Sequence, residues 1–227
     1  MKKLFFILFL GAISSSCSSD SSSGPTLSNV PEAKAEFDNN NYGIYKGVFV
    51  GSSGTVYINI NNEGVVSATL TIDGSSSTYS TTETVTENST TEGLTFTNGS
   101  NSFDFNVNAD GTSPTISNVD IIAHANARME IIKEQSDSLA RCYIGSFSGD
   151  DNGTFNVVFD ENGLVGLAKS DEDDNAFYLY GGAPGETTIN GYFPGGNFGG
   201  IIEGNTIQGG WENDIPESGS WFGIRKL

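Results

Sequence analysis

The sequence contains two copies of one glycine–aromatic pattern, and this repeat restricts the possible folds more than any other feature. The pattern Tyr-x-Gly-x-Phe-x-Gly occupies residues 45–51 and again residues 143–149. Each copy continues with a Gly-Thr pair and then with alternating large apolar residues, which are Val56, Ile58 and Ile60 in the first copy and Phe155, Val157 and Phe159 in the second. Since side chains two apart on a strand share a face, the same face is buried in both copies. The chain therefore contains a duplicated β unit.

Short alternating runs separated by turn residues continue after each copy, as is typical of all-β sandwiches and barrels. In the second unit, strands are predicted after the opening hairpin at 164–169, 176–182, 188–193, 198–203, 206–212 and 219–226. In the first unit, residues 75–92 predict a long exposed hairpin. Residues 121–134 predict a closing strand, equivalent to 219–226, rather than a helix. The predicted fold is all-β, with two related antiparallel β-meander units that form small barrels or a barrel-like sandwich. The turn rhythm resembles the architecture of the avidins and lipocalins, and one shared barrel or two separate barrels both fit it.

The N-terminus has the layout of a secretory signal. Met1-Lys2-Lys3 precedes an apolar run at 4–13, which is too short to cross a bilayer, and small residues lead to Cys17. With its Ser/Asp-rich continuation, this segment resembles the lipoprotein signals of the Bacteroidota. The resemblance implies cleavage after residue 16, acyl chains such as palmitate on Cys17, and a lipid-anchored protein of the outer membrane.

These features divide the chain into a signal peptide at 1–16, a Ser-rich lipid-anchored tether at 17–41, and β units at 42–141 and 142–227. The 28 acidic and 10 basic side chains give a formal net charge of −18. Such a charge excludes nucleic acid as a partner, because phosphates require a basic surface. It also opposes electrostatic docking on anionic lipid, so the acyl chains must hold the protein at the membrane.

Cys142 aligns with Ile44 of the first copy, which predicts a small buried hydrophobic residue rather than a nucleophile. His124 is the only histidine. One histidine and one cysteine beyond Cys17 cannot complete a zinc site, and His124 is the only base available to a Cys–His pair or a catalytic triad.

Acidic loops raise the question of calcium, which binds six to eight oxygen ligands. The weak candidate ligands are Asp150, Asp151, Asp171, Asp173 and Asp174. They lack the EF-hand spacing, and Asp-Asn-Gly stretches are ordinary β-turn chemistry. The sequence therefore predicts no cofactor, with calcium as an alternative.

Aromatic residues of the second unit supply the candidate ligand-binding positions, which are Tyr178, Tyr192, Trp211 and Trp221. The first functional hypothesis is a non-enzymatic binding or structural module of the cell envelope, whose ligand is a glycan, a small molecule or a protein. A surface hydrolase of glycan or protein would instead use paired carboxylates in a concave pocket beside aromatics, with Glu203, Glu212 and Glu217 as the first candidates. A third alternative, a barrel for a small apolar ligand, requires an internal cavity.

Overall fold

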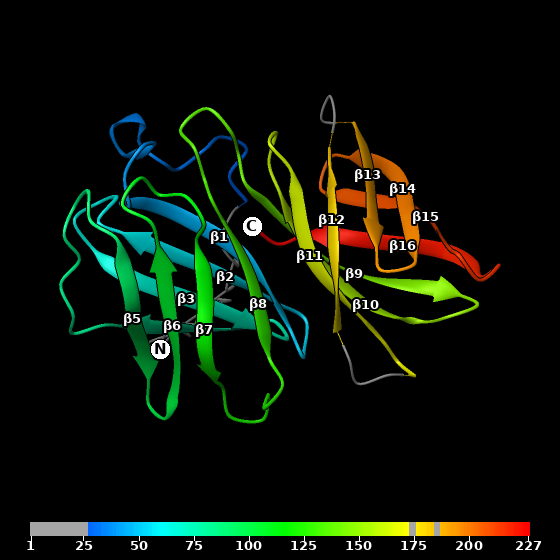
Figure 1. The fold of residues 1–227 in the computed structure, drawn as a ribbon, viewed down its shortest axis with the longest axis horizontal. Coiled ribbons are helices and arrows are strands. Elements are labelled where there is room, and N and C mark those ends of the chain that lie inside the picture. Colours follow the sequence, from blue (N-terminus) through cyan, green and yellow to red (C-terminus); the bar gives the residue numbers. More distant parts are fainter. Residues whose placement is uncertain (1–26, 173–175, 184–186) are drawn as a thin grey trace, which may run out of the picture.

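The two halves of the chain fold into two antiparallel β units that lie side by side, as the computed structural model in Figure 1 shows. The structure describes residues 27–172, 176–183 and 187–227. In this part of the chain the only helical element is a 3₁₀ turn, η1, at Ala35–Phe37. No helix among the described residues is long and apolar enough to cross a membrane. The predicted all-β fold with two barrel-like units is confirmed.

The first unit is an eight-stranded sheet in the order β7-β6-β5-β4-β3-β2-β1-β8. Its strands are β1 (Gly43–Val50), β2 (Gly54–Ile60), β3 (Val66–Ile72), β4 (Ser75–Ser80), β5 (Thr91–Asn98), β6 (Asn101–Val107), β7 (Thr115–Asp120) and β8 (Arg128–Lys133). The sheet curls almost to closure, with β7 and β8 as its two outer strands.

Two expectations about the first unit can now be judged. The closing strand within 121–134 is confirmed as β8, which pairs with β1 as β16 pairs with β9. The exposed hairpin at 75–92 is wrong, since β4 pairs back onto β3 across the turn at Asp73-Gly74. Tyr79 explains the difference: it is the one buried residue of β4, and its ring packs against Phe103 in the core. The Ser/Thr-rich composition of the segment predicted exposure and did not reveal this one buried residue.

The second unit is a closed barrel of eight strands in meander order, with β16 paired to β9. Its strands are β9 (Arg141–Gly149), β10 (Gly153–Phe159), β11 (Leu164–Ser170), β12 (Ala176–Gly182), β13 (Thr188–Phe193), β14 (Gly196–Glu203), β15 (Thr206–Asn213) and β16 (Ser218–Arg225). Every strand predicted here is present, with bounds shifted by at most two residues.

The repeated glycines have a geometric reason. Gly51 ends the pattern in the first unit and Gly149 in the second, and their φ angles are +117° and +140°. Only glycine adopts this region at low cost, and here it turns the chain out of β1 or β9 into the hairpin. The repeat is thus also a repeat of backbone conformation.

Strand β1 lies between the two cores. All eight of its residues are buried, because one face packs into its own unit and the other meets the second unit. Val48 packs there with Cys142 and Val158. Across the same junction Asn156 Nδ2 donates a hydrogen bond to the carbonyl of Phe49 at 2.5 Å. Apolar packing and a buried amide therefore fix the two units against each other.

The carboxylate of Glu134, which is fully buried, joins three segments at this junction. Lys46 Nζ of β1 donates to Glu134 Oε2 at 2.7 Å, and the backbone N–H of Ala140 donates to the same oxygen at 3.1 Å. The backbone N–H of Glu32 donates to Oε1 at 2.7 Å. Residues 27–41, expected to belong to the tether, are thus partly held against the folded units.

Candidate functional site

The two units differ in how their interiors are filled. In the first unit the largest core side chains are essentially inaccessible, with Phe96, Phe103 and Phe105 at 0% exposure. In the second unit several of the largest interior aromatics stay partly accessible, namely Phe147, Phe177, Phe193, Phe198 and Trp211. Rings that point inward from a closed barrel and still retain accessible surface border an internal space or an open end of the barrel.

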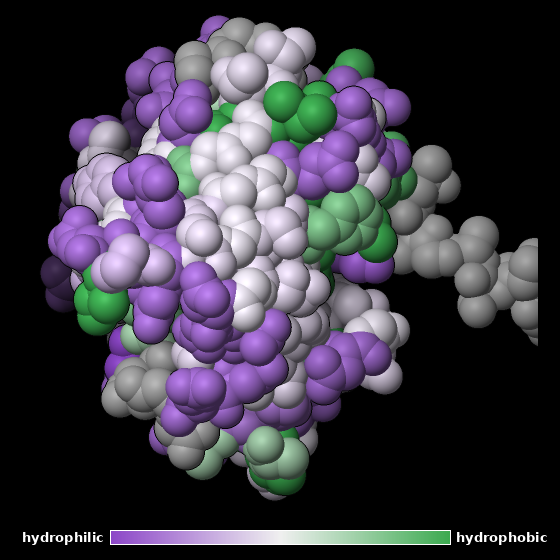
Figure 2. Space-filling view, turned by 90° about the vertical axis from the view of Figure 1, so that its right-hand side faces the viewer, coloured by the Kyte–Doolittle hydropathy of each residue, from purple (hydrophilic) through white to green (hydrophobic). Residues whose placement is uncertain are grey.

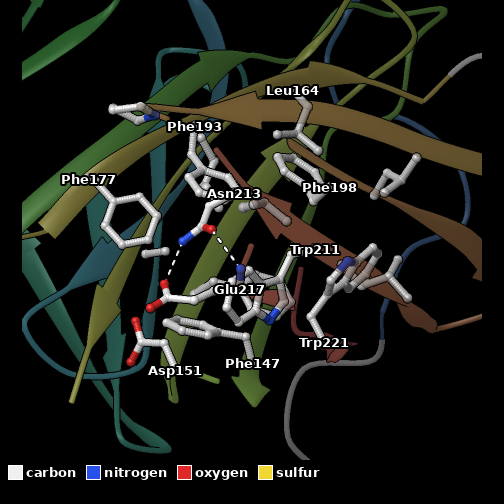
Figure 3. A pocket seen from close by; sticks show the side chains of 17 residues that line it. Phe147, Asp151, Leu164, Phe177, Phe193, Phe198, Trp211, Asn213, Glu217 and Trp221 are labelled. Atoms are coloured by element: carbon white, nitrogen blue, oxygen red, sulfur yellow. Dashed lines mark hydrogen bonds between the residues drawn. The ribbon is translucent and has the colours of Figure 1, made fainter. Parts of the chain in front are cut away.

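That space is a cavity of about 260 Å³ inside the second barrel. Its wall consists almost entirely of aromatic and aliphatic side chains, and Figure 3 shows many of these rings converging on it. The lining residues are Phe147, Asp151, Phe155, Val157, Leu164, Ala168, Phe177, Leu179, Ile189, Phe193, Pro194, Phe198, Ile207, Trp211, Asn213, Glu217 and Trp221. The volume lies just below the roughly 300–1,000 Å³ of typical small-molecule pockets.

Glycines on neighbouring strands allow the large rings to lie flat against the barrel wall. A Cβ at Gly200 or Gly209 would lie 2.6 Å from the Trp221 ring, and one at Gly219 would meet Trp211. Glycine in a strand loses packing and is kept where something approaches closely. Here the approaching group is an indole, and the centre of the barrel stays open as a result.

At corresponding positions of the repeat, the second unit has smaller inward side chains than the first. Leu70 pairs with Val56 in the first unit, and Ala168 pairs with Phe155 at the matching register of the second. Two residues earlier, Ala68 of the first unit is replaced by Gly166 in the second. The side chains of β11 therefore fill less of the interior of the second unit than those of β3 fill in the first.

The polar residues of the cavity gather at one end. Asp151, Asn213 and Glu217 come from or beside the loops 150–152 and 214–217, which lie at the same end of the barrel. Asn213 Nδ2 donates to Glu217 Oε2 at 2.7 Å, and Ser170 Oγ donates to Asp151 Oδ1 at 2.8 Å. Figure 3 shows both carboxylates beside Phe147 at this end. The cavity thus has a polar, negatively charged mouth.

The opposite end is closed by an aromatic plug. Tyr143 and Phe159 stack with ring centroids 5.1 Å apart and planes 4° apart, and both are buried.

Both indole N–H groups of the wall are already used, since Trp221 Nε1 donates to the carbonyl of Gly210 at 2.9 Å and Trp211 Nε1 to that of Ser148 at 3.3 Å. The interior consequently offers apolar contact and few free hydrogen-bonding groups.

The structure separates the predicted ligand-binding residues. Trp211 and Trp221 line the cavity, whereas Tyr178 and Tyr192 project from the outer face of the barrel. The cavity aromatics that went unnamed, such as Phe147 and Phe177, lie on inward positions of strands that were predicted. Period-2 alternation from Tyr143 and from Leu179 would have placed both of them inside.

The candidate carboxylates are also separated. Glu203 accepts a hydrogen bond from Gln208 and Glu212 from Asn197, and both are exposed on the outer wall. Only Glu217 reaches the cavity, where its neighbour at the mouth is Asp151. Figure 2 shows the molecule from the side of the second barrel, where hydrophobic residues occur only as scattered green patches.

For calcium, the described residues contain no group of three or more His, Cys, Asp or Glu arranged around a possible metal position. Asp150 Oδ2 accepts from the backbone N–H of Ser218, so this bond and the Asp151 bond above each link the loop after β9 to another strand at the same end of the barrel. Asp171 follows β11, and its backbone N–H donates to the carbonyl of Asn152. Asp173 and Asp174 lie outside the described residues.

His124 and Cys142 lie in different parts of the structure and have different hydrogen-bond partners. His124 sits in the turn after β7, where its Nδ1 is 3.0 Å from Ser52 Oγ and its ring packs edge-on against Phe49. Cys142 is fully buried at the junction of the units, and its Sγ donates to the carbonyl of Gly47 at 3.3 Å. Burial raises the pKa of the Cys142 thiol to about 12.

We expect the Cys142 thiol of the native protein to resist alkylation by iodoacetamide at pH 8, because the nucleophilic thiolate is disfavoured. Cys142→Val should cost less than about 1.5 kcal/mol of unfolding free energy, as for other apolar swaps of similar size. The pKa of the thiol in the folded protein lies above the ordinary 9.0. Burial of the neutral thiol therefore does not lower the unfolding free energy below pH 9, but the unfolding free energy falls as the pH rises from 9 to 12. The wild type should therefore lose about 1 kcal/mol more than the variant at pH 10 in urea unfolding. Rapid alkylation of the folded protein would contradict this.

Comparisons with protein-family models, with curated proteins and with solved structures gave no match for this chain. The functional argument therefore rests on the cavity and its surroundings.

Proposed function

We propose that this chain is a lipid-anchored, non-enzymatic envelope protein that binds a small, largely apolar ligand inside its second barrel. The observation that carries the proposal is the aromatic cavity of about 260 Å³ with its polar mouth. A duplicated unit that is filled in one copy and hollow in the other supports a specialised role for the second copy.

The lining defines the class of ligand. An apolar ring system would gain roughly 25 cal/mol for each Å² removed from water, and the surrounding aromatic faces favour flat, unsaturated compounds. Asp151 and Glu217 at the mouth repel an anionic end group, so a fatty acid carboxylate fits poorly. An uncharged or positively charged end, able to donate hydrogen bonds to the two carboxylates, fits best.

The proposal is tested with N-phenyl-1-naphthylamine as the probe. Both tryptophans of the chain line the cavity, so excitation of tryptophan should transfer energy to a probe bound there. We expect saturable probe emission together with quenched tryptophan emission. Linear, non-saturating probe emission without quenching would contradict binding in the cavity.

The anchor is a separate part of the proposal and rests on the N-terminal sequence. Acyl chains on Cys17 would retain the protein at the outer membrane, where two or more chains give stable residence. Mass spectrometry of the protein purified from its native membrane should show a mature chain that starts at Cys17 and carries diacylglycerol and a further acyl group. In Cys17→Ala the N-terminal acyl groups should be absent from the mass spectrum, and a wild-type mature N-terminus with an unmodified Cys17 would contradict the anchor.

A second candidate function follows from the two carboxylates at the mouth, because paired acids beside aromatics are what a carboxylate-dependent hydrolase requires. The cavity behind them favours the binding proposal, since it offers a sugar few hydrogen-bonding partners. Release of nitrophenol from aryl glycosides, lost in both Asp151→Asn and Glu217→Gln, would favour the hydrolase instead.

A further inference from the structure

Three tyrosines stand in single file on the outer face of the second barrel. Tyr178 and Tyr180 of β12 stack with ring centroids 5.9 Å apart and planes 17° apart. Tyr180 and Tyr192 of β13 continue the file at 5.7 Å and 32°. Their exposed fractions are 38%, 40% and 59%. Three large rings that remain partly in water and overlap one another at these separations form a stepped aromatic platform.

The platform borders a groove of about 870 Å³ between the two units. Tyr180 and Tyr192 line it on the barrel side, together with Val165 of β11. Ile132 of β8 contributes from the first unit, and Figure 1 shows β8 beside β11. Sites between units are preferred places for ligands, because two surfaces converge there.

Polar groups lie beside the rings at one end of the groove. Asp160 and Asn162, in the turn between β10 and β11, line it next to Gly163. The carboxylate of Asp160 accepts hydrogen bonds from the backbone N–H groups of Asn162 and Gly163, which fixes the turn. Asn190 of β13 adds an amide close to Tyr192. The groove therefore combines apolar faces with hydrogen-bonding edges.

The charges around the groove restrict its ligand. Among the described residues that line it, Asp160 is the only charged one, and no lysine or arginine is present. Glu130 of β8 adds a second negative charge close enough to act on Tyr180. Arg128 of the same strand partly offsets the charge of Glu130. A phosphorylated, sulfated or uronic-acid polymer would still be repelled by Asp160, with no cation among the described lining residues to bind it.

We propose that this groove binds a neutral oligosaccharide, with consecutive sugar rings stacked on the tyrosine file. A pyranose presents apolar C–H groups on its faces and hydroxyls around its edge. The faces match the parts of the Tyr178, Tyr180 and Tyr192 rings that stay accessible. The hydroxyls match the exposed amide of Asn190, since the carboxylate of Asp160 is already held by its own turn. A file one ring wide suits a linear chain better than the broad, compact patch of a protein interface. The groove is separate from the barrel cavity, so the two sites can be tested independently.

The test is affinity electrophoresis of the whole protein in gels that contain one neutral polysaccharide each: laminarin, xylan, mannan, galactomannan or starch. We expect retardation in at least one gel and saturable binding of the matching hexasaccharide by calorimetry. Tyr180→Ala and Tyr192→Ala should each raise Kd at least tenfold, whereas Tyr180→Phe, which keeps the ring, should stay within threefold of wild type.

Phe222→Ala is the matched control, because Phe222 is an equally exposed aromatic (44%) on β16, away from the groove. It should leave the hexasaccharide Kd unchanged, and N-phenyl-1-naphthylamine binding should be the same in all four variants. No retardation in any of the five gels, or equal loss in Phe222→Ala, would overturn the proposal. So would binding restricted to alginate or pectate, or a wild-type dimer that Tyr180→Ala converts to a monomer, since the file would then serve an anion or a second copy of this chain.

Discussion

Replacing Ala168 with leucine is expected to abolish binding of N-phenyl-1-naphthylamine while making the protein more stable. Ala168 lines the cavity and lies between Phe155 and Phe177 in the strand register. The added carbons would occupy the space proposed for the ligand, at the position where the first unit already has Leu70. We expect at least a hundredfold rise in the probe Kd. Filling the cavity should raise the unfolding free energy by about 0.5–2 kcal/mol.

The same substitution in the other unit is the matched control. Ala68 of β3 is 1% exposed within a core of fully buried rings. Ala68→Leu should therefore overpack the first unit and cost about 1–3 kcal/mol, yet leave probe binding intact. Urea unfolding and probe titration of both variants measure the two effects. If both variants lose similar stability, or if Ala168→Leu still binds the probe, the second barrel is not a hollow binding site.

Replacing Glu134 with leucine should have the largest effect on stability, a loss of about 3–5 kcal/mol in urea unfolding, because it leaves a buried lysine without its closest partner. Lys46 is 1% exposed, and its remaining carboxylate, Glu32, lies 2.9 Å away with 43% of its side chain accessible. Three backbone N–H groups, those of Glu32, Ala33 and Ala140, would also lose their acceptor. The variant should loosen the N-terminal segment together with the junction of the units.

Two further variants separate the charge from the hydrogen bonds. Glu32→Gln should cost less than about 1 kcal/mol, because an ion pair with an accessible partner is screened by water. The double variant Lys46→Met, Glu134→Leu removes both buried charges and should recover part of the loss, leaving the cost of the unpaired N–H groups, about 1–3 kcal/mol. A double variant no more stable than Glu134→Leu alone would show that the ion pair contributes little.

Much of the fold could be predicted because its determinants are local. Alternation of apolar residues marked the inward face of β2 and β10, and turn glycines marked their ends. The repeat then predicted that β8 would take the place of β16. The prediction failed at β4, where one buried tyrosine among serines and threonines outweighed the composition of the segment.

The candidate site was less predictable for a different reason. Trp211 and Trp221 were recognised as candidates, but Tyr178 and Tyr192 were grouped with them, although the barrel wall separates the two pairs. Strand alternation tells which residues share a face, and it does not tell whether the interior behind that face is full. The partner of Glu134 was also hidden, because Lys46 is 88 positions away and reads as a solvent-facing residue of β1.

By itself, the sequence determined the strands of the second unit and the duplication, since each depends on neighbours or on a repeated spacing. The tertiary structure alone decided that the first unit is filled and the second hollow, because that depends on the summed side-chain volume that eight strands bring to one centre. It also decided that the outer face of β1 is buried, since a second unit covers Lys46 and Val48 there. Closure and contact between units join residues that no local pattern relates.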